Sequence, residues 1–319
     1  MQEYNCKYRN FNKVDTLKEK VSEISPTFRK ELNSVIDLDF VSQSDRIEGI
    51  NTFQDIADFL TRPDIRVLHS TSSFGFEPPK EDPHFKIPMD EPYDGYLPEE
   101  YLDYLRNTNV LVFDPNTNEE HYIETTGHFA AISEMINEAR RANRASRKGQ
   151  SIPLTAEFIS DHLNNHILGT KYGRYRSGYY CPIARLKGVD LCLENGANVD
   201  RELENLLDWY NNQSKGLHPI IRAAIFHAEF IRIHPFADGN GRTARLLSNY
   251  ELVKNGYPTI TIKAKNRDEY CSALYKAITT GDVTDLVDLF TKRMLATEHL
   301  YINKALESQF FNDDKELGD

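Results

Sequence analysis

The apolar residues of this chain recur every three or four positions over most of its length, which is the period of an α-helix with one buried face. A first helical region is predicted from about Asp15 to Leu60, with Leu32, Ile36 and Phe40 among its apolar positions. Further helices are predicted at about 128–146, 155–168, 200–213, 219–233, 240–255, 267–280 and 283–307. The predicted fold class is therefore all-α, with one or two small hairpins.

Two stretches depart from the helical period. Residues 70–118 are rich in Pro, Asp and Glu, which predicts an extended connector. At its end, the segments 109–114 and 121–124 flank a turn at Pro115 and predict a small hairpin. Between Tyr172 and Lys187, glycines alternate with aromatic residues. We expect a second short hairpin there, at about Tyr175 to Lys187.

The segment 219–233 is apolar on most sides, so we expect this helix at the centre of the bundle. Pro219 lies near its first position, where a proline is tolerated. Pro235 disfavours the α conformation at His234, which predicts that the helix stops there and leaves His234 in a loop. Within the helix, we expect His227 to be a packed residue.

Composition and charge narrow the class of protein. The 319 residues are 39% hydrophobic, enough for a substantial core. A net charge of -11 argues against broad contact with nucleic acid or an anionic membrane. Neither an N-terminal leader nor an 18-residue apolar run is recognisable, so a cytoplasmic protein without a membrane span is expected. The cysteines form no C-x-x-C pair and are predicted to be reduced thiols: Cys6, Cys181, Cys192 and Cys271.

The most informative chemistry lies in residues 233–245. A helix is predicted to begin within Asp238-Gly239-Asn240-Gly241, where backbone N–H groups and the helix dipole favour an anion. Arg242 and Arg245 are three residues apart and therefore project from one face of this helix. Two guanidinium groups beside open amides predict a phosphate-binding site.

Two neighbouring residues add the means for group transfer. Asp238 offers a carboxylate for Mg²⁺, which commonly binds one or two carboxylates together with substrate phosphates. His234 is close enough in sequence to act as a general base on an incoming hydroxyl. No Lys-Ser/Thr pair follows the glycines, so this is not a Walker A loop. Each residue alone has a common structural explanation, but all of them at one helix start indicate transfer of a phosphate-containing group from a nucleotide.

The run His234-Pro-Phe-Ala-Asp-Gly-Asn-Gly-Arg-Thr-Ala-Arg245 resembles the signature of Fic-domain (Fido) proteins at every defining position. The likeness extends over about Leu154 to Lys292. It implies a Fic-type helical bundle that transfers AMP from Mg-ATP to a Ser, Thr or Tyr hydroxyl of a target protein. It also implies the following roles: His234 as base, Asp238 as Mg²⁺ ligand, Gly239, Asn240 and Gly241 as the anion hole, and Arg242 and Arg245 on the polyphosphate.

Two further segments gain a meaning from this resemblance. The hairpin predicted after Tyr172 lies where the family carries a target-binding flap, which points to Tyr175, Ser177, Tyr179 and Ile183 as its residues. Upstream, Ser44-Asp-Arg-Ile-Glu48-Gly49 resembles the inhibitory motif of the family. Ser44 and Glu48 share a helix face, and Gly49 is a stop signal. By this resemblance Glu48 pairs with Arg245, takes the place of the γ-phosphate and makes the enzyme autoinhibited.

The expected organisation is an N-terminal helical regulatory region over 1–145, a catalytic core over 146–308 and a charged tail over 309–319. The expected partners are ATP and a target protein, and a homodimer stays open. Two alternatives to AMP addition remain. The same site could remove AMP or transfer another nucleotide or a phosphate. The chain could also be a nucleotide-dependent interaction module without catalysis.

Overall fold

The structure is a computed structural model that describes residues 1–8, 10–50, 119–168, 183–186, 189–192, 198–236 and 238–316. Helices dominate these residues, as the apolar period predicts. They are α1 (Asn12–Glu23), α2 (Pro26–Ile47), α5 (Glu119–Ser146), α6 (Asn165–Ile167), α7 (Val199–Asp208), α8 (Pro219–Ile233), α9 (Asn240–Lys254), α10 (Arg267–Thr280) and α11 (Thr284–Glu316). Two π-helical segments, η1 (Phe158–Asn164) and η3 (Trp209–Gln213), and the 3₁₀ turn η4 (Ala264–Asn266) complete the helical elements.

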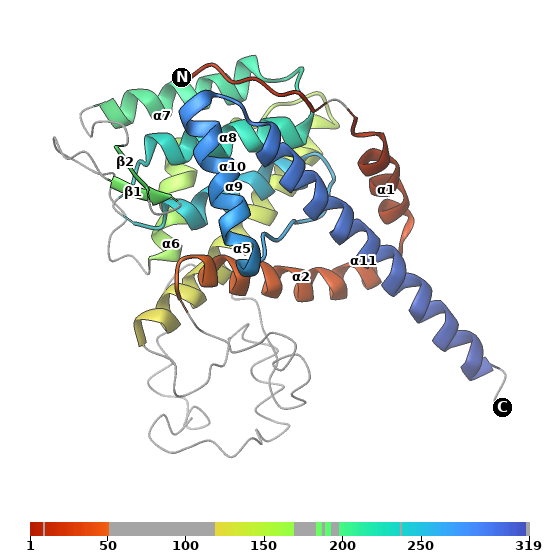
Figure 1. Ribbon diagram of the computed structural model, residues 1–319. Coiled ribbons are helices and arrows are strands. Elements are labelled where there is room, and N and C mark those ends of the chain that lie inside the picture. Colours follow the sequence, from red (N-terminus) through yellow and green to blue (C-terminus); the bar gives the residue numbers. More distant parts are fainter. Residues whose placement is uncertain are drawn as a thin grey trace.

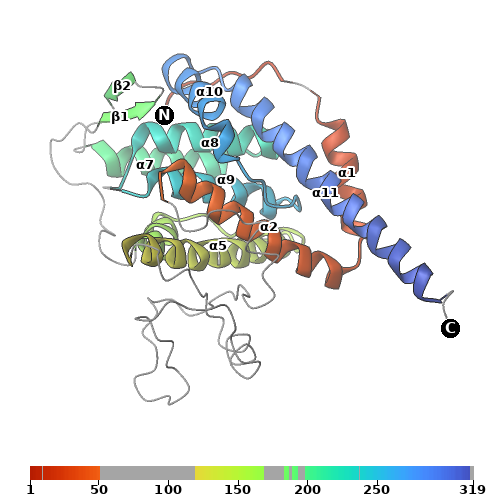
Figure 2. The same ribbon diagram turned by 60° about the horizontal axis from the view of Figure 1, so that its bottom comes forward.

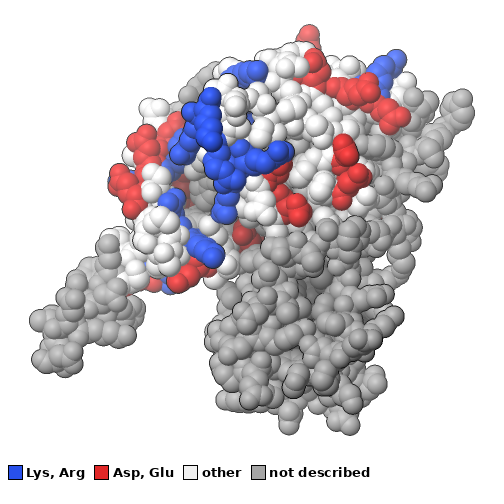
Figure 3. All heavy atoms as spheres, turned by 180° about the vertical axis from the view of Figure 1, so that it is seen from behind, with Lys and Arg blue, Asp and Glu red and all other residues white. Residues whose placement is uncertain are grey.

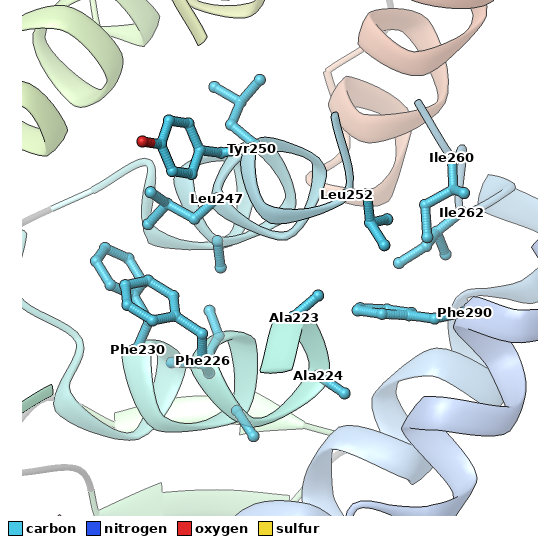
Figure 4. Close-up of a cluster of buried hydrophobic side chains, with 14 of the residues drawn as sticks. Ala223, Ala224, Phe226, Phe230, Leu247, Tyr250, Leu252, Ile260, Ile262 and Phe290 are labelled. Atoms are coloured by element: carbon cyan, nitrogen blue, oxygen red, sulfur yellow. The ribbon is translucent and has the colours of Figure 1, made fainter. Parts of the chain in front are cut away.

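Helices α8 and α9 form the centre of the bundle (Figure 1). Nearly every side chain of α8 is buried, which confirms the central position predicted from its apolar character. Figure 4 shows Phe226 and Phe230 of α8 facing Leu247 and Tyr250 of α9. Burial of such side chains contributes roughly 1.5–3 kcal/mol each. The α8–α9 pair is therefore a rigid frame for the short turn that joins the two helices.

The described part of the predicted N-terminal helical region consists of two helices and ends with α2 at Ile47, while residues 51–60 of the prediction lie outside the described residues. The break falls at Ser25, and Pro26 opens α2 at a position where its missing N–H is not needed. Helix α1 packs against α11, while α2 runs between α5 and α11 and contacts α9 (Figures 1 and 2). The C-terminal half of α2 is buried, polar residues included, so this helix is an integral layer of the bundle.

The prediction of a hairpin around Pro115 is wrong for the second of its two strands. Residues 121–124 lie in the first turns of α5, and residues 109–114 lie outside the described residues. The buried positions Thr125, His128, Phe129 and Ile132 follow the helical period and pack against neighbouring helices. That tertiary burial favours helix over the local strand pattern.

A hairpin does occur after residue 172, but later than expected. Strands β1 (Ile183–Leu186) and β2 (Val189–Cys192) pair antiparallel, with Ile183 opposite Cys192 and Leu186 opposite Val189. β1 lies against α10. Among the predicted flap residues, Tyr175, Ser177 and Tyr179 lie outside the described residues, and Ile183 opens β1. The role of this hairpin as a flap stays a prediction.

One hydrophobic core joins the expected regulatory and catalytic regions. It includes Phe40 of α2 and Ile132 of α5 together with Phe226 of α8 and Leu246 of α9. The functional division near residue 145 stays a prediction, because packing is continuous across it. The predicted tail is helical as far as Glu316, since α11 continues beyond residue 307. Cys6 and Cys271 are free thiols, in line with the sequence. Among the described helices, none is both long and apolar enough to cross a membrane.

Phe290 of α11 joins the outer layer to this core, so its removal tests the packing. It is fully buried, and Figure 4 shows its ring near Leu252 and Ile262. Phe290→Ala should lower the free energy of unfolding by about 3–5 kcal/mol through lost burial and a cavity. Leu306→Ala, on an exposed position of the same helix, should change it by less than about 0.5 kcal/mol. Urea unfolding of both variants measures this, and equal losses would contradict the packing.

Candidate functional site

The turn between α8 and α9 is built around Gly239, the N-cap of α9. Its φ of 74° is left-handed, and a Cβ there would lie 2.8 Å from the side-chain nitrogen of Asn164. Asn164 is buried at the end of η1 and donates from Nδ2 to the carbonyl oxygen of Asp238 (3.0 Å) and to Oγ1 of Thr243 (3.2 Å). Glycine is required because only a residue without Cβ fits both the left-handed conformation and this approach.

Asn240 holds the other half of the turn. Its Oδ1 accepts the backbone N–H of Phe236 (2.9 Å), and its Nδ2 donates to the carbonyl oxygen of the same residue (2.8 Å). Phe236 is fully buried, so the two hydrogen bonds connect the turn directly to the core. The backbone at the start of α9 is therefore held in place by side chains on both sides.

His234 follows the last residue of α8, as Pro235 predicts. It has φ 51° and ψ 60°, and among the described residues it is the one non-glycine with a positive φ. Its N–H donates to the carbonyl oxygen of Phe230 at 2.9 Å, which closes the helix with a left-handed cap. A left-handed non-glycine residue costs on the order of 1–3 kcal/mol and persists where the surrounding structure determines it. The imidazole is thus placed at the mouth of the turn by a strained backbone.

Asp238 is the exposed member of the turn. Its Oδ1 accepts the N–H of Gly239 at 2.6 Å, so the carboxylate lies at the N-terminal end of α9. No group of three or more His, Cys, Asp or Glu side chains in the described residues could hold a metal ion by itself. One exposed carboxylate beside a phosphate site nevertheless fits Mg²⁺, which takes its other ligands from phosphate and water.

Arg245 is the centre of the contacts between α9 and α2. Its side chain is only 3% exposed. Nε donates to Oγ of Ser44 (2.8 Å), and Nη2 donates to the carbonyl oxygen of Ser44 (3.0 Å) and to Oε1 of Glu48 (2.7 Å). The pairing of Glu48 with Arg245 expected from the sequence is therefore present in the geometry.

The carboxylate of Glu48 lies against the N-terminus of α9. A Cβ on Gly241 would be 2.3 Å from Oε1 of Glu48, so glycine at this position permits the approach. Burial alone would raise the pKa of Glu48, but attraction to Arg245, with smaller contributions from Arg242 and Arg267, outweighs it and holds the pKa below its usual value. An anion is thus favoured at this helix end, where Glu48 supplies it.

Gly49 ends α2 in a Schellman motif. Its φ is 84°, its N–H donates to the carbonyl oxygen of Arg46, and the N–H of Ile50 donates to that of Asp45. This motif makes Glu48 the C-cap residue, with its side chain directed from the last turn of α2. The stop signal at Gly49 is confirmed.

Asp45 anchors the same turn from the opposite side. It is fully buried, and its carboxylate accepts hydrogen bonds from Oγ1 of Thr125 (2.8 Å) and pairs with Nδ1 of His128 (2.7 Å), both on α5. Burial lowers the pKa of His128 in spite of the attraction to Asp45. His128 is therefore a neutral donor at pH 7, and the Asp45 cluster fixes the end of α2 on α5.

The segment 263–267 holds α2 along its length. Lys263 pairs with Asp39 at 2.5 Å, and the backbone N–H of Ala264 donates to the side chain of Gln43 at 2.9 Å. Nε of Arg267 donates to the carbonyl oxygen of Ile47 at 3.0 Å, which satisfies one of the open carbonyls at the helix end. The position of Glu48 is thus set by contacts distributed over α2.

His227 is packed behind Arg245, as expected. It is fully buried on α8, its Nδ1 lies 2.9 Å from Oγ of Ser248, and its Nε2 lies 2.8 Å from the hydroxyl of Tyr270. Tyr270 in turn interacts with Arg245. Burial, with a further contribution from the charge of Arg245, lowers the pKa of His227 to about 3. His227 therefore supports the site as a neutral residue.

The structure brings two groups of predicted residues into one site. His234, Asp238, Gly239, Asn240, Gly241, Arg242 and Arg245 surround the start of α9, and Ser44, Glu48 and Gly49 reach it from α2. Arg242 is buried at 2% exposure. Sequence reasoning missed Asn164, Asp45, His128 and Tyr270, which position the others. No local pattern marks them, because their partners are far away in the sequence.

Comparison with known proteins agrees with this geometry. Residues 153–252 match the model of the Fic/DOC family. The chain is 39% identical over 105 residues to protein adenylyltransferase fic-1 of Caenorhabditis elegans, which covers 33% of this chain and 20% of that protein. It is 41% identical over 95 residues to protein adenylyltransferase Fic of Drosophila mojavensis, covering 30% and 19%. The matched segment thus spans about a fifth of the length of these relatives.

Two solved structures share the fold over most of the chain. A Fic domain containing signaling protein from Bacteroides thetaiotaomicron has a TM-score of 0.64 and 23% identity, covering 94% of this chain and 98% of that one. A Fic-1 fragment from C. elegans has a TM-score of 0.63 and 21% identity, covering 93% and 72%. These similarities establish a Fic-type helical fold.

The contribution of the buried Asp45 cluster to stability can be measured by substitution. Asp45→Ala leaves the buried polar groups of Thr125 and His128 without their acceptor and should lower the free energy of unfolding by about 2–3 kcal/mol. Asp39→Ala, which removes a partly exposed ion pair with Lys263 on the same helix, should lower it by no more than about 1 kcal/mol. Guanidinium unfolding at pH 7 compares the two. If Asp45→Ala costs no more than Asp39→Ala, the Asp45 cluster is not the anchor.

The buried neutral His227 makes the stability of the fold depend on pH. The folded state binds a proton at His227 only near pH 3, whereas the unfolded chain does so near pH 6.5. This contribution to stability is present above pH 6.5 and is lost as the pH falls toward 3. Between pH 7 and pH 5 it amounts to about 2 kcal/mol. His227→Gln should reduce the fall in unfolding free energy over this interval by about that amount, and an unchanged fall would contradict the buried neutral histidine.

Proposed function

The chain carries a Fic/DOC-family domain at residues 153–252, and from this premise we propose that it is a protein adenylyltransferase. In this proposal it transfers AMP from ATP to a Ser, Thr or Tyr hydroxyl of a target protein, and Glu48 holds it in an inhibited state. The observation that carries the proposal is the carboxylate of Glu48 on Arg245 and Gly241, in the anion site of α9.

The start of α9 supports binding of a polyphosphate. Its first turn begins Gly239-Asn240-Gly241, and backbone N–H groups at a helix N-terminus attract phosphate oxygens. Arg242 and Arg245 add two positive charges on the same face, in a buried setting where charge-assisted hydrogen bonds are strong. The hydrogen bonds of Asn164 and Asn240 hold these groups before a ligand arrives, which reduces the cost of binding.

His234 is proposed as the general base. It takes the proton of the target hydroxyl as the hydroxyl oxygen forms a bond to the α-phosphorus of ATP. The bond from that phosphorus to the oxygen that bridges to the β-phosphate breaks, and pyrophosphate leaves. Asp238 would hold Mg²⁺, whose charge neutralises the phosphate oxygens. The rigid cap of α8 keeps the imidazole in a fixed place, which favours proton transfer at short range.

Inhibition follows from competition for one position. Glu48 neutralises Arg245, so a phosphate that takes the same place must displace a carboxylate held at 2.7 Å. The Glu48 side chain is 36% exposed while that of Arg245 is 3% exposed. The carboxylate is thus the part of the pair that can move toward solvent. We therefore propose that activation displaces Glu48 and leaves Arg245 in place for the nucleotide.

The test of inhibition is Glu48→Gly. This variant should raise transfer of label from α-labelled ATP to protein by about ten-fold or more, since it removes the competitor of phosphate at Arg245. Glu48→Gln, which keeps the size but removes the charge, should give a smaller rise. Glu31→Gln, on an exposed position of the same helix, is the matched control and should leave transfer unchanged. Equal rates for Glu48→Gly and the parent chain would refute autoinhibition.

The same assay separates the alternatives. Within the Glu48→Gly form, His234→Ala should lower transfer by about 10²–10⁴-fold. Label that appears on protein from γ-labelled but not α-labelled ATP would establish phosphate transfer instead. Release of AMP from a pre-modified target, faster than its addition, would establish removal. Nucleotide-dependent partner binding that survives His234→Ala without any transfer would favour an interaction module.

A further inference from the structure

A second charged site lies in a cleft away from the α8–α9 turn. The cleft has a volume of about 470 Å³ and runs between α2, α5 and the chain that follows α9. Its floor includes the buried residues Asp37, Thr259 and Tyr301. Five cations line it: Arg29, Lys30, Arg140, Arg144 and Arg147. The concentration is unusual because the chain as a whole has a net charge of -11.

These five cations have no carboxylate within ion-pair distance in the part of the chain that the structure describes. By contrast, Arg222 and Arg245 each have one, Glu251 and Glu48. Among the described residues that line the cleft, Asp37 is the one acidic side chain, and it is 6% exposed. Burial raises its pKa to about 7 even though Arg140 lowers it, so Asp37 offsets less than a full charge near neutral pH.

The position of two cations is locally unfavourable. Arg29 and Lys30 follow Pro26 at the start of α2, where the helix dipole favours anions and disfavours cations. The Nε of Arg29 is buried and has no hydrogen-bond partner. Arg144 and Arg147, at the C-terminal end of α5, are placed where the dipole favours them. An anion bound between α2 and α5 would attract Arg29 and Lys30 and so offset their unfavourable interaction with the dipole of α2.

Lys and Arg side chains also gather visibly on one side of the molecule. Figure 3 shows them clustered on the face seen from behind, with Asp and Glu side chains around them. The net charge of -11 disfavours a long polyanion or an anionic membrane, whereas a small anion needs only the cations that line the cleft. The cleft is within the size range of ligand-binding pockets.

We propose that this cleft binds a small anion that carries two or more phosphate groups and that the anion bridges α2 to α5. Cations from both helices face the same space, so one phosphate group contacts Arg29 and Lys30 while another contacts the arginines of α5. A single phosphate cannot satisfy five cations spread over two helices. Guanidinium groups suit this ligand because they bind phosphate oxygens through two parallel hydrogen bonds.

Binding in this cleft also acts on α2. The helix contributes Arg29 and Lys30 to the cleft at one end and Glu48 to the α9 site at the other. A ligand that bridges α2 to α5 binds only when α2 is docked, so it stabilises the docked position by mass action. The effect on inhibition rests on the proposed function, whereas the binding itself does not.

Calorimetric titration of the whole chain with tripolyphosphate at constant ionic strength tests the site. The double variant Arg29→Gln/Arg140→Gln should weaken binding by about ten-fold or more. Arg141→Gln is the matched control, because Arg141 neighbours Arg140 on α5 but pairs with Glu138 outside the cleft. It should bind like the parent chain. Equal affinity of the double variant and the control would overturn the proposal, whether or not the chain transfers AMP.

A variant that binds tripolyphosphate more tightly than the parent chain cannot be explained by misfolding. Asp37→Asn removes the opposing charge and keeps the size of the side chain, and at pH 7.5 it should tighten tripolyphosphate binding by about three-fold. Inorganic phosphate should bind more weakly than tripolyphosphate. Amide exchange in residues 36–47 should slow on adding tripolyphosphate to the parent chain but not to the double variant.

Two other results would show that the cleft binds a different class of ligand. Phosphatidylcholine vesicles with phosphatidylserine, or a single-stranded RNA, could bind more tightly than tripolyphosphate and lose that binding in the double variant. Either result would assign the cleft to a membrane or to a nucleic acid and overturn the proposal. An unchanged or weakened affinity in Asp37→Asn would also count against an anion in the cleft.

Discussion

The burial of Arg245 is the constraint on which the site depends. A guanidinium group that is 3% exposed must find hydrogen-bond acceptors and negative charge within the protein, since an unpaired buried charge is very costly. Ser44 and Glu48 supply them from α2, and Tyr270 supports the same group from α10. The same charge of Arg245 therefore determines both how α2 docks and which anion lies at the N-terminus of α9. In the proposed function, a phosphate group of the nucleotide takes the place of Glu48 beside Arg245.

The frame around this charge is rigid for identifiable reasons. Asn164 donates two hydrogen bonds from its Nδ2 to the α8–α9 turn, and Asn240 holds the turn with both its Oδ1 and its Nδ2. His234 is kept in a left-handed conformation at the end of a helix whose side chains are nearly all buried. Under the proposed function, such preorganisation means that nucleotide binding and proton transfer would require little rearrangement of this turn. The adjustable part is the side chain of Glu48, which is the more exposed partner of the ion pair.

Helix α2 connects the two sites for which anion binding is proposed, one filled by the carboxylate of Glu48 and one lined by cations. At its C-terminal end it brings its own carboxylate to a helix N-terminus, and at its N-terminal end it brings cations to an open cleft. Between them, Asp45 is fully buried against α5, so the two ends are joined by a well-packed helix. A ligand at one end and a nucleotide at the other would both act on the position of the same element.

The sequence by itself determined most helices, the stop signals at His234 and Gly49, and the identity of the groups around α9, because these follow from local period, backbone preference and a contiguous motif. It predicted a strand at 121–124, where the structure has helix α5. It also predicted a hairpin at about Tyr175 to Lys187, and the described strands of that region lie at 183–186 and 189–192. Only the tertiary structure decided these, together with the roles of Asn164 and Asp45. Their partners lie 74–83 positions away, so packing brings them together and no local pattern encodes it.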